Sequence, residues 1–212
     1  MRHLLLTLVV TGAVLTPGSA GAQEGYSLES LLVSSGSDPI TSGIAAIARF
    51  RDGSGRFAEV SAQSEQAWLA YGKYFGGGER SLIAAGAVGH FQTAPLLGLR
   101  FDAVFRLGES VRLEALYWPG VLLEEPTDWK TENDGVENPE GVYHGQFGGL
   151  RLAVGPVQVS YYMLNFLDEP WNELPGISYA WSFRNDIAAS LSATWNNNSR
   201  DWLPWIGLVW AP

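Results

Sequence analysis

Apolar and polar residues alternate along two neighbouring segments, residues 96–107 and 111–117. The apolar set comprises Leu97, Leu99, Phe101, Ala103, Phe105, Leu107, Val111, Leu113, Ala115 and Tyr117. The intervening polar set comprises Arg100, Asp102, Arg106, Arg112 and Glu114. A period of two places these sets on opposite faces of β-strands, and the turn-forming residues 108–110 separate the segments. The pattern therefore predicts a hairpin with one apolar face and one charged face.

The same alternation predicts strands along most of the remaining chain. They comprise residues 44–50, 56–75, 81–91, 142–154, 157–166, 177–183, 187–195 and 202–210. Segment 56–75 is longer than the roughly 9–11 residues with which one strand crosses a bilayer. We therefore expect this strand to contain a bend or to project beyond the membrane. The alternation of apolar and polar residues changes phase at Gly148 and Gly149, which predicts a β-bulge there. We expect an all-β fold, a single closed antiparallel up-and-down barrel of about ten strands, with eight as the alternative.

The start of the chain has the pattern of a secretory signal peptide over residues 1–22. Arg2 and His3 form a short basic region, an apolar run follows, and Ala20-Gly21-Ala22 is a cleavage site of the A-x-A type. The run is too short to cross about 30 Å of hydrocarbon as a helix. Residues 23–42 are polar and rich in serine and glycine, so we expect an N-terminal lead-in there. The barrel domain then occupies residues 43–212.

Composition narrows the classes of protein that fit this pattern. The net charge of −9 argues against nucleic acid, because nucleic-acid binding needs basic patches. The chain has no cysteine, which excludes cysteine-based sites and disfavours a small exported soluble domain stabilised by disulfides. Glycine (25 residues) and aromatic residues (9 Trp, 8 Tyr, 9 Phe) are abundant, as expected for tight turns and interfacial belts.

Turn lengths also follow a pattern. Connections are short at residues 76–79, 108–110, 155–156 and 184–186 and longer at 124–141, 167–176 and 196–201, with 53–55 and 93–95 as short exceptions. Aromatic residues gather at strand ends. The whole pattern resembles the outer-membrane β-barrels of Gram-negative bacteria, which have short periplasmic turns, longer extracellular loops and periplasmic termini. The resemblance implies a small, porin-like integral protein of the cell outer membrane, surrounded by the lipid bilayer.

In such a barrel the charged faces point into the lumen. The candidate lumen residues are Arg49, Arg51, Glu59, Glu65, Arg100, Asp102, Arg106, Arg112, Glu114, Arg151 and Arg184. We expect these residues to pair with one another and plug a narrow interior, in preference to lining a conducting pore. The function favoured by this interpretation is non-enzymatic, with a structural, narrow-channel or surface-binding role. Lipopolysaccharide or a small ligand are the candidate partners.

Two alternative functions remain open. One is an outer-membrane enzyme with an acid–base site at the extracellular rim, for which His90, His144 and Glu59 are weak catalytic candidates. No Ser/His/acid spacing supports this alternative. The other is a secreted, soluble, lipocalin-like barrel that binds a small apolar ligand, because closed soluble barrels also alternate. Acidic loop 124–141 lacks the D-x-[DN]-x-[DN]-G pattern of a calcium loop, so the sequence predicts no metal site and no cofactor.

Overall fold

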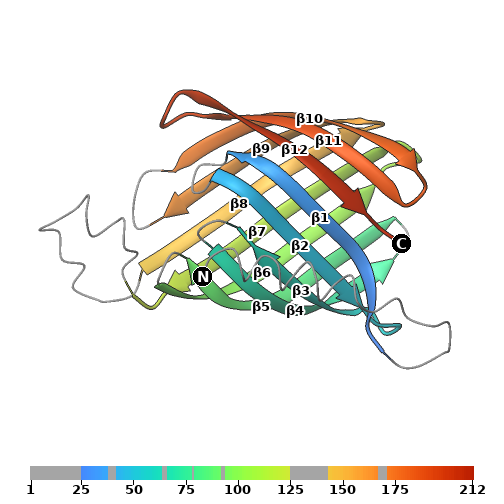
Figure 1. Ribbon diagram of the computed structural model, residues 1–212, viewed down its shortest axis with the longest axis horizontal. Coiled ribbons are helices and arrows are strands. Elements are labelled where there is room, and N and C mark those ends of the chain that lie inside the picture. Colours follow the sequence, from blue (N-terminus) through green and yellow to red (C-terminus); the bar gives the residue numbers. More distant parts are fainter. Residues whose placement is uncertain are drawn as a thin grey trace, which may run out of the picture.

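The chain folds into a closed antiparallel β-barrel of twelve strands, as the computed structural model shows (Figure 1). The structure describes residues 25–37, 42–63, 66–77, 79–91, 94–124, 143–166 and 171–212. The strands are β1 (Ser27–Ser37), β2 (Ser42–Arg51), β3 (Arg56–Ala62), β4 (Gln66–Gly77), β5 (Arg80–Phe91), β6 (Ala94–Arg106), β7 (Val111–Leu122), β8 (Tyr143–Val154), β9 (Val157–Phe166), β10 (Asn172–Arg184), β11 (Ile187–Asn196) and β12 (Asp201–Trp210). Each strand pairs with the next along the chain, and β1 closes the barrel against β12. Within the described residues no helix is long and apolar enough to cross a membrane.

The all-β, up-and-down barrel predicted from the sequence is confirmed, but the expected strand number of about ten, or eight, is wrong. Residues expected to form a lead-in contain β1, which pairs with β2 and β12. The single long strand expected over 56–75 is two strands, β3 and β4. Where they meet, the Gln63 amide donates a hydrogen bond to the Gln66 carbonyl over 2.7 Å. The predicted signal peptide, residues 1–22, lies outside the described residues.

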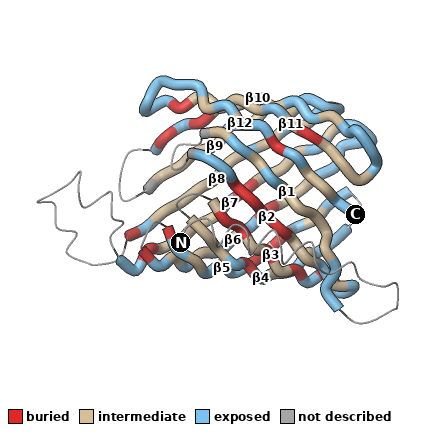
Figure 2. The backbone as a smooth tube through the Cα atoms, in the orientation of Figure 1, coloured by how far each residue is buried: buried red, intermediate tan, exposed pale blue. Residues whose placement is uncertain are grey.

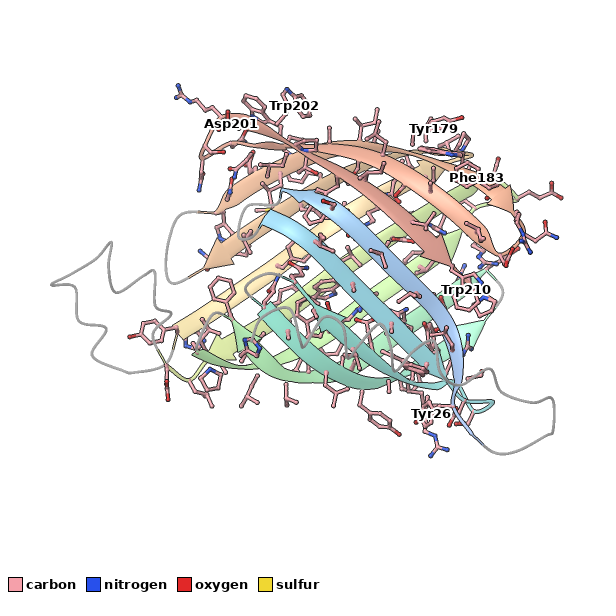
Figure 3. All side chains as sticks on the ribbon, in the orientation of Figure 1. Tyr26, Tyr179, Phe183, Asp201, Trp202 and Trp210 are labelled. Carbon is pink, nitrogen blue, oxygen red and sulfur yellow. The ribbon has the colours of Figure 1, made fainter. Side chains whose placement is uncertain are left out.

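The two additional strands change how the connections are distributed between the two ends of the barrel. The short connections at 53–55, 76–79, 108–110, 155–156 and 184–186 fall at one end, which we call the turn end. The connections from β3 to β4 and from β5 to β6 are also short but fall at the opposite end, the loop end, together with the longer connections. Residue Tyr26 and the last strand also reach the turn end, at the right of Figures 1 and 3. There the Ala211 amide donates to the Asp186 carbonyl over 2.8 Å.

The outer face of the barrel is apolar and exposed. Its exposed residues include Leu69, Tyr71, Phe75, Leu82, Val88, Leu97, Leu99, Phe101, Phe105, Tyr117, Leu150, Leu152, Val154, Val157, Val159, Tyr161, Ile177, Tyr179, Phe183, Leu191, Trp202, Ile206 and Leu208. Leu99 and Leu191 are 53% and 55% exposed. Figure 3 shows aromatic side chains such as Trp202 and Phe183 projecting outward near the two ends. Soluble proteins rarely expose so large a contiguous apolar surface, so this face favours a lipid environment over the soluble alternative.

Strand register explains the apparent change of face at Gly148 and Gly149. β8 pairs with β7 and β9 without a register shift, so the predicted bulge is wrong. The alternation simply continues, and the aromatic residues Tyr143 and Phe147 point inward, where polar residues were expected. A register shift does occur in β1, between Leu28 and Ser30.

Apolar clusters inside the barrel stabilise the wall formed by β3 to β8. Near the turn end Phe57, Ile83 and Ala85 are buried together, with Tyr74 packed against them. Near the loop end Phe91, Ala94, Leu122 and Tyr143 form a second buried cluster. Figure 2 shows that buried segments are interspersed along the strands and are not gathered in a separate core, as the alternation of a barrel wall requires. The clusters leave the middle of the lumen to charged residues.

Candidate functional site

The β6–β7 hairpin that dominates the sequence pattern has the predicted faces. Arg100 and Asp102 on β6 point into the lumen, and Glu114 on β7 shares that face. The register places Arg106 opposite Arg112, as the short turn predicts. Asp102, however, lies opposite Leu116 and not towards Glu114. Like charges directly opposite one another repel, and Glu114 on the same strand as Arg112 offsets this repulsion.

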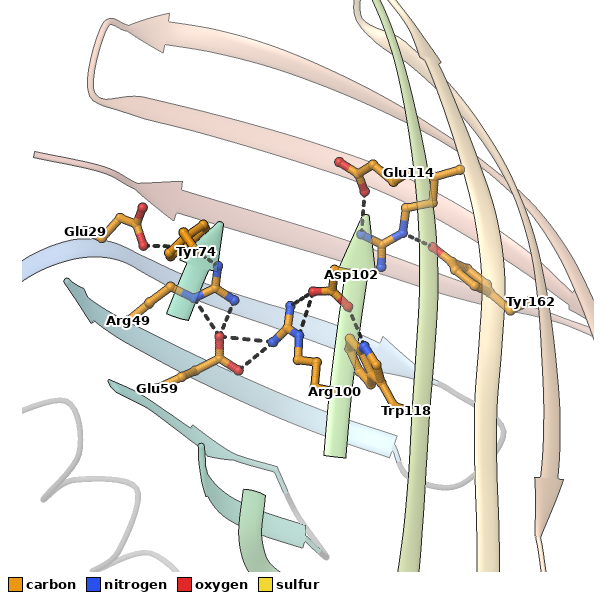
Figure 4. Close-up of polar contacts among 10 residues, drawn as sticks. Glu29, Arg49, Glu59, Tyr74, Arg100, Asp102, Glu114, Trp118 and Tyr162 are labelled. Atoms are coloured by element: carbon orange, nitrogen blue, oxygen red, sulfur yellow. Dashed lines mark hydrogen bonds and ion pairs between the residues drawn. The ribbon is translucent and has the colours of Figure 1, made fainter. Parts of the chain in front are cut away.

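Four charged residues from β2, β3 and β6 form a continuous network inside the barrel (Figure 4). Arg49 Nε donates to Glu59 Oε2 over 2.8 Å. From the other side Arg100 Nη1 donates to Glu59 Oε1 over 3.0 Å. Arg100 Nε in turn donates to Asp102 Oδ2 over 2.6 Å. Glu59 thus bridges two guanidinium groups, and Arg100 bridges two carboxylates.

Neutral side chains extend this network at both ends. Arg49 Nη1 donates to the Tyr74 hydroxyl over 2.8 Å, and that hydroxyl donates to Glu29 Oε2 over 2.9 Å. Glu29 occupies the register shift of β1, and an irregularity of this kind re-aims a side chain. At the other end Trp118 Nε1 donates to Asp102 Oδ1 over 2.6 Å. The connected residues therefore reach from β1 to β7.

Small residues allow charges on β3 and β6 to meet across two intervening strands. Ala70 lies opposite Glu59 on β4, and Ala85 lies opposite Arg100 on β5. Because neither alanine projects far into the lumen, the Arg100 side chain can extend over them towards Glu59. The two carboxylate residues are almost completely covered, since Glu59 is 1% and Asp102 3% exposed. Buried carboxylates require such pairing, because an isolated buried charge is very costly.

A second charged group lies on β7 to β9. Glu114 accepts hydrogen bonds from Arg112 Nε over 2.8 Å and from Arg151 Nη1 over 3.2 Å. Arg151 Nε also donates to the Tyr162 hydroxyl over 2.6 Å, and its guanidinium lies 5.4 Å from the centre of the Tyr162 ring. Arg151 is thus held in place by both a carboxylate and an aromatic ring.

Among the other predicted lumen residues, Arg51 joins the first group near the turn end, because it pairs with Glu29 over 3.3 Å. Arg106 and Arg184 lie outside the two groups. Arg184 pairs with Asp186 over 3.2 Å, and its side chain is largely exposed. Arg106 is also exposed at the turn end. Glu65 lies outside the described residues.

The three weak catalytic candidates do not meet. Glu59 lies within the lumen, and its expected place at the extracellular rim is wrong because the 53–55 turn belongs to the turn end. His90 on β5 and His144 on β8 are exposed, lie on the outer face near the loop end and are separated by β6 and β7. The described residues contain no group of three or more His, Cys, Asp or Glu residues that could hold a metal ion. The geometry offers no acid–base site built from these residues.

A cavity of about 490 Å³ occupies the loop-end half of the lumen, and the sequence did not predict it. Its lining is mainly apolar and includes Ile47, Trp68, Ala70, Ala87, Leu96, Gly98, Trp118, Gly120, Leu122, Gly145, Phe147, Tyr162, Leu164, Leu174, Leu203 and Trp205. Arg100 and Arg151 border it on the side of the charged groups. The sequence signal that could have revealed the cavity is the set of small inward residues on β4 to β8.

A row of aromatic rings lies beside the two arginines at this border of the cavity. Trp118 and Phe147 have ring centres 5.2 Å apart, and Phe147 and Tyr162 5.3 Å apart. The Arg100 guanidinium lies 4.6 Å from the Trp118 ring centre. The lumen therefore changes from charged and aromatic at mid-height to apolar towards the loop end.

The barrel is similar to solved porin structures. The KdgM porin aligns with a TM-score of 0.59 and 8% sequence identity, covering 86% of this chain and 99% of the porin, and it has also been solved in complex with disordered oligogalacturonate. The NanC porin aligns with a TM-score of 0.56 and 9% identity, covering 88% of this chain and 100% of the porin. No known family profile and no curated protein matches the chain. At the level of fold, the predicted class of outer-membrane β-barrels is confirmed.

Proposed function

We propose that this protein is a small, non-enzymatic β-barrel of the outer membrane whose lumen carries no steady ion current. Its placement in the membrane is supported by the apolar outer face and by the closed sheet, which leaves no unpaired strand edge in lipid. The porin fold agrees with this placement. With the turn end in the periplasm, the loop end and its cavity face the exterior.

The observation that carries the proposal is the burial of paired carboxylates where a pore would need water. Glu59 and Asp102 are almost inaccessible, and each is bonded to Arg100. Charges that are paired with one another do not form the ring of unpaired charges that attracts ions into a channel and lets them pass. The apolar section towards the loop end is a second barrier, because a hydrated ion would lose its water there.

The same pairing argues against a pathway for acidic sugars. The KdgM porin has been solved with oligogalacturonate, which carries carboxylates. A polyanion would need free cationic groups along its path. In this barrel Arg49, Arg100 and Arg151 each have a carboxylate partner on the lumen wall. We therefore do not propose oligogalacturonate as a ligand of this protein.

Planar-bilayer recording tests the proposal. The parent protein should show no steady conductance. Asp102→Ala should raise the conductance, because it removes one of the two carboxylates that hold Arg100 and opens space in the charged layer, and it should lower stability by a few kcal/mol. Asp186→Ala is the matched control, since Asp186 pairs with Arg184 in an exposed turn, and this variant should behave like the parent. A steady, ion-selective current through the unmutated barrel would overturn the closed lumen.

A further inference from the structure

The cavity in the loop-end half of the lumen is built to stay open. Bulky residues would fill a barrel of this size, yet the inward positions across β4 to β8 include Ala70, Ala87, Gly98, Gly120 and Gly145. Gly98 and Gly120 lie opposite one another, so the wall between β6 and β7 presents only backbone there. The larger side chains Trp68, Trp205 and Phe147 frame the space without closing it.

The polarity of the lining defines what the cavity accepts. Water needs two to four polar partners to occupy a cavity stably, and most of this lining offers none. Arg100 and Arg151 border the cavity but already hold carboxylates, so they do not demand an anion. Near the loop end Gln66 Nε2 donates to Gln63 Oε1 over 2.7 Å, so these amides are also engaged with one another.

The size of the cavity sets the size of its occupant. Small-molecule sites are typically concave, mainly apolar and about 300–1,000 Å³ in volume, and this cavity of about 490 Å³ fits that description. A cavity of about 150 Å³ lined by apolar residues holds one benzene, so this one has room for about three aromatic rings or an equivalent aliphatic chain.

We propose that the loop-end half of the lumen is a binding chamber for one neutral, apolar small molecule of about this size. The Trp68, Trp118 and Trp205 side chains provide flat apolar surfaces for it. The charged groups at mid-lumen form the closed floor of the chamber. This binding site is additional to the proposed closed barrel, since it depends on the apolar lining and not on whether ions pass.

The chamber can be tested with N-phenyl-1-naphthylamine, a neutral three-ring fluorophore, by measuring its binding to the barrel in lipid nanodiscs. Empty nanodiscs measure the fluorophore that dissolves in lipid, which increases linearly with its concentration. This signal is subtracted from that of the nanodiscs that contain the barrel. We expect one saturable site per barrel in the parent. Gly98→Leu should weaken it about tenfold or more, because the new side chain enters the cavity. A Cβ at Gly98 meets its nearest atom at 3.5 Å, so the backbone tolerates the substitution.

Gly86→Leu is the matched control, because Gly86 lies on the outer face of β5 and a Cβ there meets nothing within 4 Å. This variant should bind like the parent. Ala87→Phe provides a second cavity-filling variant, with Val88→Phe as its outward-facing partner on the same strand. A parent that shows only linear partitioning, or a folded Gly98→Leu or Ala87→Phe variant that binds as tightly as the parent, would overturn the chamber. Conductance is measured in a separate experiment, so the test of the binding chamber and the test of the closed lumen do not depend on each other.

Discussion

At the residue scale, the Glu59 carboxylate has the strongest constraints in the lumen. It accepts hydrogen bonds from Arg49 and Arg100 and is 1% exposed. Its own burial is expensive, and its removal would leave Arg49 without a carboxylate partner and Arg100 with Asp102 alone. The network thus stabilises this barrel only while it is complete.

Glu59→Ala should lower the free energy of unfolding by about 3–5 kcal/mol, the cost of breaking a buried ion pair by removing one partner. Asp186→Ala is the matched control, because Asp186 pairs with Arg184 in an exposed turn outside the network and should cost about 1 kcal/mol or less. Urea unfolding of the barrel in lipid vesicles measures both. An equal and small loss of unfolding free energy in the two variants would mean that Glu59 does not hold the network together.

The sequence predicted which residues point inward but not which of them meet. Alternation alone places Glu59, Arg100 and Asp102 on the inner face. Their contact across β4 and β5 depends on barrel curvature and on the alanines between them, which a linear pattern does not contain. The cavity was missed for the same reason, because it arises where small inward residues from many strands come to the same height.

At the element scale, the strands with strong alternation were predicted and those without it were not. β6 and β7 have the expected faces. β1 was missed because its Ser- and Gly-rich sequence has no regular alternation, and β1 owes its extended form to pairing with β2 and β12. β3 and β4 were merged because the sequence between them, residues 63–65, contains neither glycine nor proline, the usual turn signals.

The β2–β3 turn carries a pH-sensitive carboxylate. Burial acts to raise the pKa of Asp52, but hydrogen bonds donated by Ser54 and Arg56 outweigh it and lower the pKa from 3.8 to about 2. A lowered pKa means that the turn is stabilised above about pH 3.8 and loses this contribution as the pH falls towards 2. Amide hydrogen exchange at Ser54 should accelerate relative to other turns over this range.

Asp52→Asn should remove most of that pH dependence, because asparagine keeps the turn geometry but does not titrate. If the parent and the Asp52→Asn variant show the same change in Ser54 exchange between these pH values, Asp52 is not the titrating group.

The outer face of β6 offers a direct test of contact with lipid. Phe101→Arg should destabilise the folded barrel by about 2–4 kcal/mol if the residue lies near the bilayer midplane, and Leu191→Arg on β11 should do the same. Leu107→Arg is the control, because Leu107 is exposed just beyond β6 at the turn end and should cost about 0–1 kcal/mol. Reversible unfolding in vesicles measures all three. Normal stability of both strand variants would show that these faces do not meet lipid.

At the scale of the whole molecule, the two faces of the barrel have opposite requirements. The outer face needs an apolar environment, while the inner face satisfies its charges internally. A closed sheet meets both needs, because every described strand pairs on two sides. The alternation of apolar and polar residues along the strands is compatible with both a soluble and a membrane barrel. The exposed apolar outer surface favours the membrane.

Membrane fractionation, followed by electrophoresis with and without boiling, tests this central claim most directly. The protein should be recovered in the outer-membrane fraction. It should migrate differently before and after boiling, because a closed barrel resists detergent until it is heated. Recovery of the folded protein in the soluble periplasmic fraction, without detergent, would contradict the account.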